Sequence, residues 1–463
     1  MKHQIKQVDP IWCEITKETA ELVKPVLSFT GVYYTQGYYR KERHEYQKHL
    51  LTKSKNCYYM LSGHLQRVIA HLGKENVTYE AGEGFPTYKH SSPEPFFEQM
   101  RRRMPNFNEK QAEAAIKLIN SARAVGKGII KAPTGVGKTV VGIGLLSCYK
   151  DISVLWLCHT KDLMLQAAKE FKANGFTDVG ILGDQICEVD KRITIATRQT
   201  FINYIEDLGT NYDAVIVDEV HHLSQMKSDY FTILSNLFAP LRFGLTATLP
   251  DKEESKLVCE GLIGPVVAAL SINEGNELGI IAKPKIKLIR MQKDHAIAEM
   301  RKYADVYNFG VVHNEKKNDK IVEIAKSHVD KGDSVLILVT QIDHGTNLMM
   351  SAKHINLPID FVQGSSESDV RMKIKNDLNS KKIKCVIATT VFFEGVNIPE
   401  LNVIINAVGG KSEIRTLQIL GRGLRKTKEK DTLILYDIVD FSHRYLAEHS
   451  VDRICVYMDQ GWL

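Results

Sequence analysis

The sequence has 463 residues, too many for one ordinary domain, and its length suggests two or three. Its composition, 44% hydrophobic and 25% charged, is ordinary for a soluble globular protein, and no run of eighteen apolar residues or apolar leader predicts a membrane span or secretion signal. A net charge of +6 permits a nucleic-acid partner without requiring one. The eight cysteines are scattered, with no C-x-x-C pair, so we expect no disulfide framework or structural zinc, and a reducing compartment.

The chain reads as three parts in order. Residues 1–82 form a small mixed segment rich in Tyr and His, and residues 83–106, with four prolines and three arginines, suggest a linker. Short apolar runs then alternate with amphipathic stretches, first GIIKA, VLWLC, ITIAT, AVIVDE and FGLTAT, then VLILVT, IDFVQG, KCVIATT, NVIINAV and TLILYDI. This alternation predicts an α/β fold of two tandem parallel-sheet domains behind a small N-terminal α+β domain. The expected boundaries are 1–90, 91–282 and 283–463.

A glycine-rich turn, APTGVGKT at 132–139, follows the first of these apolar runs. Its glycines let the backbone N–H groups face an anion, and a helix beginning near Lys138 adds the positive end of its dipole. Lys138 can reach the β- and γ-phosphates, and the Thr139 hydroxyl can bind Mg²⁺. The pattern departs from the general phosphate loop in having Ala132 at its first position. The predicted ATP cradle consists of Thr134, Gly135, Val136, Gly137, Lys138 and Thr139.

Acidic residues follow a second apolar run, in YDAVIVDEVHH at 212–222. Acids at the carboxyl end of a parallel strand face the crevice where such sheets bind ligands. We expect Asp218 to hold Mg²⁺ through water and Glu219 to orient and deprotonate the attacking water. The adjacent His221 and His222 point apart, so we expect no metal there, and one of them to couple the ATP site to a neighbouring motif.

These motifs, with GLTATLP at 244–250 and QILGRGLRK at 418–426, resemble motifs I, II, III and VI of superfamily 2 helicases in order and spacing. Weaker resemblances fall between them: CHTKDLMLQ, ATRQT, VLILVTQIDHG and IATTVFFEGVNIPEL. The resemblance covers residues 107–441 and implies two RecA-like domains that use ATP and Mg²⁺. It also implies that Phe107 and Gln111, in FNEKQAEAA, contact the adenine, and that Gly395 and Asn397 in motif V contribute to nucleotide binding. Many relatives carry Asp at the position of Asn397.

The QILGRGLRK segment places Gln418, Arg422 and Arg425 at i, i+4 and i+7, on one helical face. By the resemblance, Arg422 and Arg425 come from the second domain and meet the γ-phosphate, so that ATP closes the two domains and hydrolysis releases them. An arginine finger of this kind can be worth roughly 10³–10⁵-fold in rate.

Hydroxyl side chains follow several of the predicted strands. Short hydroxyls there donate to backbone phosphates and read no sequence, although any one of them can instead cap a helix or belong to a strand. The expected contacts to a nucleic-acid strand are Thr160, Lys161, Thr197, Gln199, Thr200, Thr340, Thr389 and Thr390.

The segment GVYYTQGYYRKERHEYQKH at 31–49 mixes aromatic rings with Arg40, Lys41, Arg43 and Lys48. That mixture suits stacking on exposed bases and neutralising phosphates, but it equally fits a hairpin whose tyrosines pack on one face. The segment at 59–80 reads as an amphipathic helix (Leu61, Leu65, Val68, Leu72) followed by a strand. It resembles the small N-terminal domain of the phage UvsW-like and XPB-like branch, and the ending DFSHRYLAEHSVDRICVY resembles UvsW-like chains.

The resemblance implies an ATP-dependent DNA helicase that remodels branched DNA by fork regression or branch migration, with 3′ to 5′ polarity. It also implies a cytoplasmic location, which is the host cytoplasm if the chain is phage-encoded. Three alternatives stay open: a double-strand translocase without strand separation, an RNA helicase, and a nucleotide-gated binding module without turnover.

Overall fold

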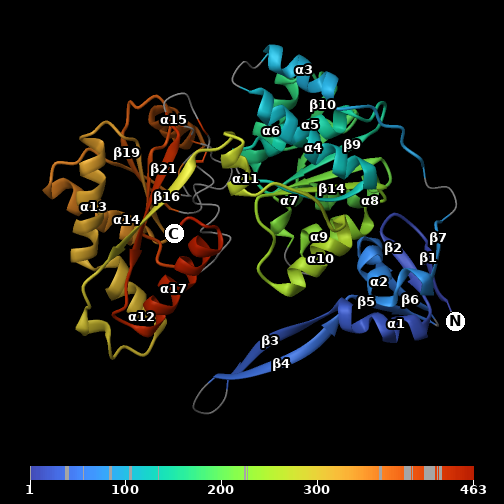
Figure 1. The fold of residues 1–463 in the computed structure, drawn as a ribbon, viewed down its shortest axis with the longest axis horizontal. Helices are drawn as coiled ribbons and strands as arrows, with labels where there is room; N and C mark the ends of the chain where they lie inside the picture. The colour runs from blue at the N-terminus through green and yellow to red at the C-terminus, as the bar shows by residue number, and fades with distance from the viewer. Residues whose placement is uncertain are drawn as a thin grey trace. The chain divides into compact units, whose positions relative to one another are not determined.

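The computed structural model describes residues 2–36, 41–55, 57–82, 86–103, 107–133, 135–223, 226, 228–363, 366, 368–389, 398, 400–410, 423–424, 426 and 430–463. The chain forms two compact units, one of Met1–Ala132 with Gly137–Leu270, the other of Pro133–Val136 with Ser271–Leu463. The first unit holds the N-terminal sheet and the first parallel sheet, and the second holds the remaining sheet (Figure 1). The predicted α/β class is confirmed, while the boundaries at 90 and 282 stay predictions.

The N-terminal region is a five-stranded sheet in the order β5-β6-β2-β1-β7, with a separate hairpin of β3 and β4 that projects from it (Figure 1). Leu61, predicted as helical, ends strand β6, and the amphipathic helix begins four residues later. The elements are β1 (His3–Gln7), β2 (Trp12–Ile15), α1 (Lys17–Val23), β3 (Ser28–Gln36), β4 (Lys41–His49), β5 (Leu51–Ser54), β6 (Cys57–Leu61), α2 (Leu65–Leu72) and β7 (Val77–Glu80).

The predicted linker at 83–106 contains a helix, α3 (Glu94–Arg103). Phe97 and Met100 on this helix are buried in the core of the first parallel-sheet domain. The interpretation of the whole segment as a linker was therefore wrong. Pro93 directly precedes the helix and Pro95 lies in its first turn, where proline does not interrupt a helix, and the two apolar side chains gain by burial.

The first parallel sheet has the order β11-β10-β12-β9-β13-β14-β8-β15. Alternate residues of each buried strand enter opposite cores: Trp156 packs with α4, α5 and α6, and Leu155 packs with α9 and α10. Both faces are therefore covered, as in other parallel sheets. The elements are α4 (Glu109–Val125), β8 (Lys127–Lys131), α5 (Lys138–Ser147), β9 (Val154–Cys158), α6 (Lys161–Ala173), β10 (Val179–Gly183), β11 (Ile186–Cys187), β12 (Ile193–Thr197), α7 (Arg198–Phe201), α8 (Ile205–Leu208), β13 (Ala214–Asp218), α9 (Asp229–Asn236), β14 (Leu241–Thr246), α10 (Glu253–Ile263) and β15 (Val266–Ala269).

The second unit is built on a parallel sheet in the order β16-β21-β20-β17-β19-β18. One face of β17 packs Val335, Ile337 and Val339 against helices α13 and α14. The five apolar runs predicted for this half all form strands. The elements are α11 (Ile272–Glu277), β16 (Lys283–Arg290), α12 (Tyr303–Tyr307), α13 (Glu315–Val329), β17 (Val335–Val339), α14 (Ile342–His354), β18 (Asp360–Val362), α15 (Ser368–Asn379), β19 (Cys385–Thr389), β20 (Val403–Asn406), β21 (Thr432–Val439) and α17 (Arg444–Asp459).

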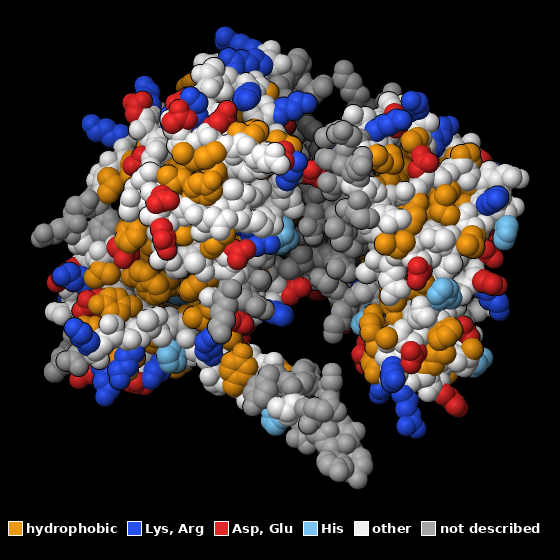
Figure 2. Space-filling view, turned by 180° about the vertical axis from the view of Figure 1, so that it is seen from behind, with side chains coloured by type: hydrophobic (Ala, Val, Ile, Leu, Met, Phe, Trp, Pro, Cys, Tyr) orange, Lys and Arg blue, Asp and Glu red, His pale blue; other side chains and the backbone are white. Residues whose placement is uncertain are grey.

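The surface carries no single dominant charge on the face drawn in Figure 2, where acidic and basic side chains are interspersed over each unit. This agrees with the small net charge of +6. Among the described residues, no helix combines the length and the apolar character that crossing a bilayer demands.

Candidate active site

The predicted site residues of the first domain lie where parallel strands end. Gly135 follows β8, Thr160 follows β9, and β12, β13 and β14 end at Thr197, Asp218 and Thr246. These strands are parallel neighbours in the sheet, so their carboxyl ends share one edge. That edge is where open α/β sheets bind ligands.

The phosphate loop has the backbone that an anion cradle requires. Gly135 and Gly137 have φ of 99° and 90°, a region that side chains with a Cβ rarely adopt. Helix α5 begins at Lys138 directly after Gly137, so its free N–H groups lie at the loop. The side chain of Lys138 is buried, and its Nζ lies 3.4 Å from Glu219 Oε1.

Glu219 occupies a strained backbone position at the end of β13. Its φ of 50° and ψ of 53° are left-handed, which is uncommon for a residue other than glycine and is a form of strain that clusters at functional sites. This conformation sets its carboxylate between Lys138 Nζ and His221 Nδ1, each at 3.4 Å. The charge of Glu219 is therefore held by two cationic or donor groups beside the phosphate loop.

Asp218 is buried beside Glu219, and its Oδ1 accepts a hydrogen bond from the Glu219 backbone N–H at 3.0 Å. Burial raises the pKa of Asp218, the neighbouring Glu219 charge raises it further, and Lys138 opposes both. The carboxylate of Asp218 and the hydroxyl of Thr139, in the first turn of α5, are oxygen ligands of the kind that Mg²⁺ prefers. Bound there, the ion would neutralise charge on the phosphates.

His221 joins motif II to motif III. Its Nδ1 lies 3.0 Å from Thr246 Oγ1, and that hydroxyl donates to the carbonyl of Thr248 at 2.6 Å. The expected link from the ATP site to a neighbouring motif is therefore made by His221. It connects the Glu219 carboxylate to the GLTAT segment through two short contacts.

The two residues predicted to contact adenine lie at the start of the first domain. Gln111 forms a capping box with Asn108: its Oε1 accepts from the Asn108 N–H at 3.0 Å and its own N–H donates to Asn108 Oδ1 at 2.9 Å. Phe107 is buried and stacks on Phe97 with ring centroids 5.9 Å apart. Both side chains have structural partners here, and their contact with a base stays a prediction.

The predicted strand contacts of the first domain include two helix caps. Thr160 Oγ1 accepts the N–H of Leu163, and Thr197 Oγ1 accepts the N–H of Thr200. A cap hydroxyl can still donate to a phosphate, because these hydrogen bonds use only its acceptor function. The others are placed as follows: Lys161 pairs with Asp184 at 2.5 Å, Gln199 and Thr340 are exposed, Thr200 is half-buried, and Thr389 is buried at the end of β19.

Several predicted residues lie outside the described part of the chain. They belong to the phosphate loop, motif V and motif VI: Thr134, Thr390, Gly395, Asn397, Gln418, Arg422 and Arg425.

The sequence analysis did not predict a cluster of stacked aromatic rings that lies beside the CHTKDLMLQ, ATRQT and DEVHH motifs. His159 stacks on His222, with ring centroids 3.8 Å apart and planes inclined by 5°. The Tyr230 ring lies nearly parallel to that of His159, with centroids 6.2 Å apart, and Arg198 Nε donates to His159 Nδ1 at 3.3 Å. The sequence did contain a hint of this cluster. His159 and Arg198 belong to the CHT and ATRQT motifs, and each is adjacent to a threonine that was predicted to contact the nucleic-acid strand.

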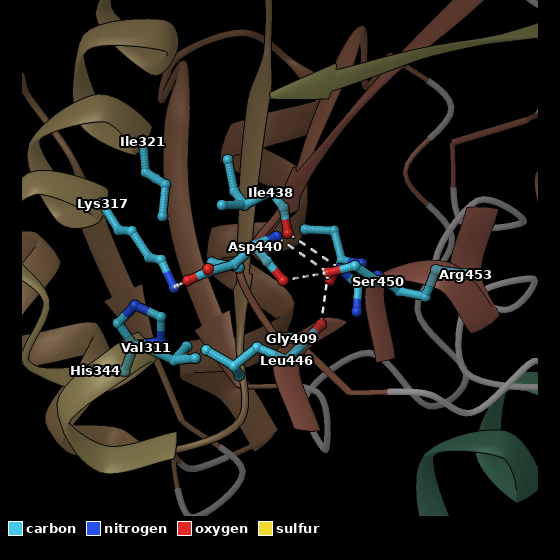
Figure 3. A pocket seen from close by; sticks show the side chains of 12 residues that line it. Val311, Lys317, Ile321, His344, Gly409, Ile438, Asp440, Leu446, Ser450 and Arg453 are labelled. Atoms are coloured by element: carbon cyan, nitrogen blue, oxygen red, sulfur yellow. Dashed lines mark hydrogen bonds and ion pairs between the residues drawn. The ribbon is translucent and has the colours of Figure 1, made fainter. Parts of the chain in front are cut away.

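The second domain holds a cavity of about 20 Å³, room for about one water molecule, lined by Lys317, His344, Asp440 and Arg453 (Figure 3). Lys317 forms a buried ion pair with Asp440 and donates to the carbonyl of Gly310. The cavity is too small for a nucleotide or a base, so these groups serve the fold.

Comparison with known proteins identifies both parallel-sheet domains. Residues 104–251 match the family "Type III restriction enzyme, res subunit", and residues 316–427 match "Helicase conserved C-terminal domain". The chain is 28% identical over 370 residues to DNA 3′-5′ translocase XPB2 of Sulfurisphaera tokodaii, across 70% of this chain and 80% of the relative. It is 24% identical over 366 residues to the ATP-dependent DNA helicase uvsW of Enterobacteria phage T4, across 72% of each chain.

A solved structure has the same fold as the motor part. S. cerevisiae Dbp5 bound to RNA and ADP BeF3 superposes with a TM-score of 0.55 at 14% identity, covering 77% of this chain and 92% of its own. Together with the two family matches, this defines a superfamily 2 helicase, an enzyme that hydrolyses ATP through two RecA-like domains. Within that superfamily the chain resembles the UvsW-like and XPB-like enzymes.

Proposed function

We propose that this chain is an ATP-dependent DNA helicase that unwinds or remodels branched DNA, by fork regression or branch migration, with 3′ to 5′ polarity. The relatives named as a DNA 3′-5′ translocase and an ATP-dependent DNA helicase support DNA as the substrate. The arrangement of Glu219 between Lys138 and His221 supports ATP turnover over a binding role without hydrolysis.

In this proposal each residue of the ATP site has one task. Lys138 binds the β- and γ-phosphates, and Thr139 and Asp218 hold Mg²⁺. Glu219 takes the proton of the attacking water, and its left-handed backbone fixes where that water must lie. Arg422 and Arg425 stabilise the transferring phosphoryl group, and strand phosphates contact Thr160, Thr197, Thr340 and their neighbours.

The observation that carries the branched-DNA proposal is how the N-terminal region joins the motor. Ile11, Phe29, Leu50 and Leu61 lie in the same apolar core as strands and helices of the first RecA-like domain. Phe29 is the second residue of β3 and Leu50 directly follows β4, so the base of the β3–β4 hairpin is anchored in the motor core. A DNA arm held there would be moved with the first RecA-like domain.

The test is ATP hydrolysis and strand release on single-stranded DNA, blunt duplex, a replication fork, a Holliday junction and a matched RNA fork. We expect the fastest turnover, with product release, on forks and junctions. Turnover on blunt duplex without strand release would instead establish a double-strand translocase. Preference for the RNA fork would make the enzyme an RNA helicase, and absence of turnover on every substrate would leave a binding module.

The hairpin can be tested separately through Tyr46 and Lys48, which are both exposed on β4. The double variant Tyr46→Ala, Lys48→Ala should lose fork affinity by roughly 1–3 kcal/mol, the range for one stacked base, and keep its activity on single-stranded DNA. Lys53→Ala on β5, exposed in the same region, is the matched control. Equal fork affinity in the double variant and the control would show that the hairpin is a packed structural feature.

A further inference from the structure

A continuous chain of side chains links the predicted strand-contact loops to the water-activating carboxylate. Arg198 donates to His159 at 3.3 Å, and His159 stacks on His222 at 3.8 Å between ring centroids. The rings of His222 and His221 follow at 4.2 Å, and His221 lies 3.4 Å from Glu219. No step in this chain leaves the first RecA-like domain.

The two ends of the chain are attached to different functions. His159 directly precedes Thr160 and Arg198 directly follows Thr197, so a phosphate bound at either threonine pulls on the backbone next to the cluster. His221 contacts both Glu219 and Thr246 at the other end. Packed side chains of this kind can carry coupling between sites, because a displaced ring must move its stacked neighbour.

The charges show that the stack is built on neutral rings. The pKa of His159 is lowered to about 4 and that of His222 to about 3, mainly by burial and to a smaller extent by neighbouring Arg and His side chains. The Arg198 N–H donates to His159 Nδ1, which therefore carries no proton. Arg198 is itself held by an ion pair with Asp229 and lies 5.8 Å above the Tyr230 ring. The side chains of the cluster are therefore held in one arrangement and are not free to change rotamer as exposed side chains are.

We propose that Arg198, His159 and His222 form a positioning relay that makes ATP hydrolysis respond to strand binding, by aligning Glu219 through His221. The inference rests on the proposed function in assuming a nucleic-acid strand at Thr160 and Thr197. The three residues touch neither ATP nor the strand in this scheme. Their role is to transmit a displacement of the strand-contact loops to the carboxylate that orients water.

The experiment measures the ATPase rate of the full chain as a function of single-stranded DNA concentration. For Arg198→Ala and His159→Ala we expect the maximal stimulated rate to fall by at least about fivefold, the lower end of ordinary coupling between sites. The rate without DNA and the half-stimulating DNA concentration should each stay within about twofold of wild type, since the relay adds nothing to unstimulated binding. His159→Phe keeps the ring and should recover part of the stimulation.

Arg192→Ala is the matched control. Arg192 also lies beside β12, half-buried, but it donates to the carbonyls of Ile152 and Tyr149 at the opposite end of the strands. It should leave stimulation unchanged, and thermal melting of each variant separates loss of fold from loss of coupling.

Three results would overturn the relay. Full maximal rate with a raised half-stimulating concentration would make Arg198 a strand contact. An equal fall in the DNA-free rate would place the cluster in the catalytic machinery, and unchanged stimulation in both alanine variants would leave it with a packing role only. Failure of the proposed function looks different, because wild type itself would then show no stimulation by DNA.

Discussion

Asp437 in the second domain and Asp218 in the first both lie buried on parallel strands, yet their surroundings differ. The Asp437 carboxylate accepts hydrogen bonds from Arg453 Nε at 2.9 Å and Nη2 at 2.8 Å, and from the hydroxyl of Tyr457. Among the described residues, Asp218 accepts one hydrogen bond, from the adjacent backbone N–H, and its pKa is raised by burial.

The comparison separates two uses of a buried charge. At Asp437 the protein supplies the hydrogen bonds that burial removed from water, so the charge strengthens the fold. At Asp218 burial raises the pKa and the neighbouring Glu219 has a strained backbone, as the predicted role of both residues in ligand binding requires. A buried acid at a strand end that has few protein partners is thus a better guide to a functional site than a buried acid whose hydrogen bonds the protein itself supplies.

The largest expected effect is in the first domain. Lys138→Ala should lower the rate of ATP hydrolysis by roughly 10³-fold or more, since one cation on the transferring phosphoryl group can be worth 10³–10⁵-fold. Stability and DNA binding should persist, because Lys138 serves the ligand more than the fold. Steady-state ATPase, DNA binding by fluorescence anisotropy and thermal melting check the three parts. Hydrolysis surviving in this variant would show that the ATP site is wrongly assigned.

The opposite result, a loss of stability, is expected when the partner of Asp437 is removed. Arg453→Ala leaves Asp437 buried without its cation and should reduce the free energy of unfolding by about 3–5 kcal/mol. Arg444→Ala on the same helix removes an exposed guanidinium and should change stability by less than about 0.5 kcal/mol. Denaturant unfolding compares the two. If Arg453→Ala loses little free energy of unfolding, a buried carboxylate with many hydrogen-bond donors would not be a sign of a charge on which the fold depends.

Stability of the second domain should also depend on pH through His344. Burial, and to a smaller extent the positive charge of Lys317, lower the pKa of His344 to about 4. The fold therefore favours the neutral ring, so its contribution is complete above the unfolded pKa of about 6.5 and is lost as the pH falls toward 4. The loss is up to about 3 kcal/mol for one such group.

The variant that isolates this effect is His344→Gln, with exposed His354→Gln on the same helix as its control. Unfolding free energies at pH 7 and pH 5 should differ less for His344→Gln than for wild type or the control. Equal pH dependence in all three proteins would mean that the pKa of His344 is nearly the same in the folded and unfolded states.

The sequence was sufficient for the architecture because the signals were local. Every quoted apolar run forms a strand, because short apolar runs bounded by polar turns and separated by helical stretches suit a parallel sheet covered on both faces. The placement of the predicted ATP-site residues at the carboxyl ends of strands also followed from the sequence, because glycines and acids that directly follow a strand are fixed there by backbone geometry. The helix α3 was missed because its burial depends on Phe97 meeting a core assembled from distant segments. The stack of His159 on His222 was missed for the same reason, as 63 residues separate the two rings (222 − 159).

The smallest expected effect concerns the ion pair between the N-terminal region and the motor. Arg67 donates to Glu260 through Nε at 2.9 Å and Nη2 at 2.6 Å, but its side chain is 41% exposed, so water and salt screen the charges. Arg67→Ala should therefore cost about 1 kcal/mol or less at low salt, and less at high salt. Lys326→Ala, which removes an exposed pair with Asp330, is the control at about 0.3–0.5 kcal/mol.

The reason for a small effect at Arg67 is that apolar contacts already hold this interface. Ile11 and Leu61 are almost fully buried in the motor core, and a Cβ at Gly63 would come within 2.0 Å of the Glu260 carbonyl oxygen, so the backbones are in direct contact. Each buried aliphatic side chain contributes about 1.5–3 kcal/mol, more than the screened pair. A loss above about 3 kcal/mol on removing Arg67 would reverse this ranking. The pair would then belong with Asp437 and Arg453, as a charge on which the fold depends.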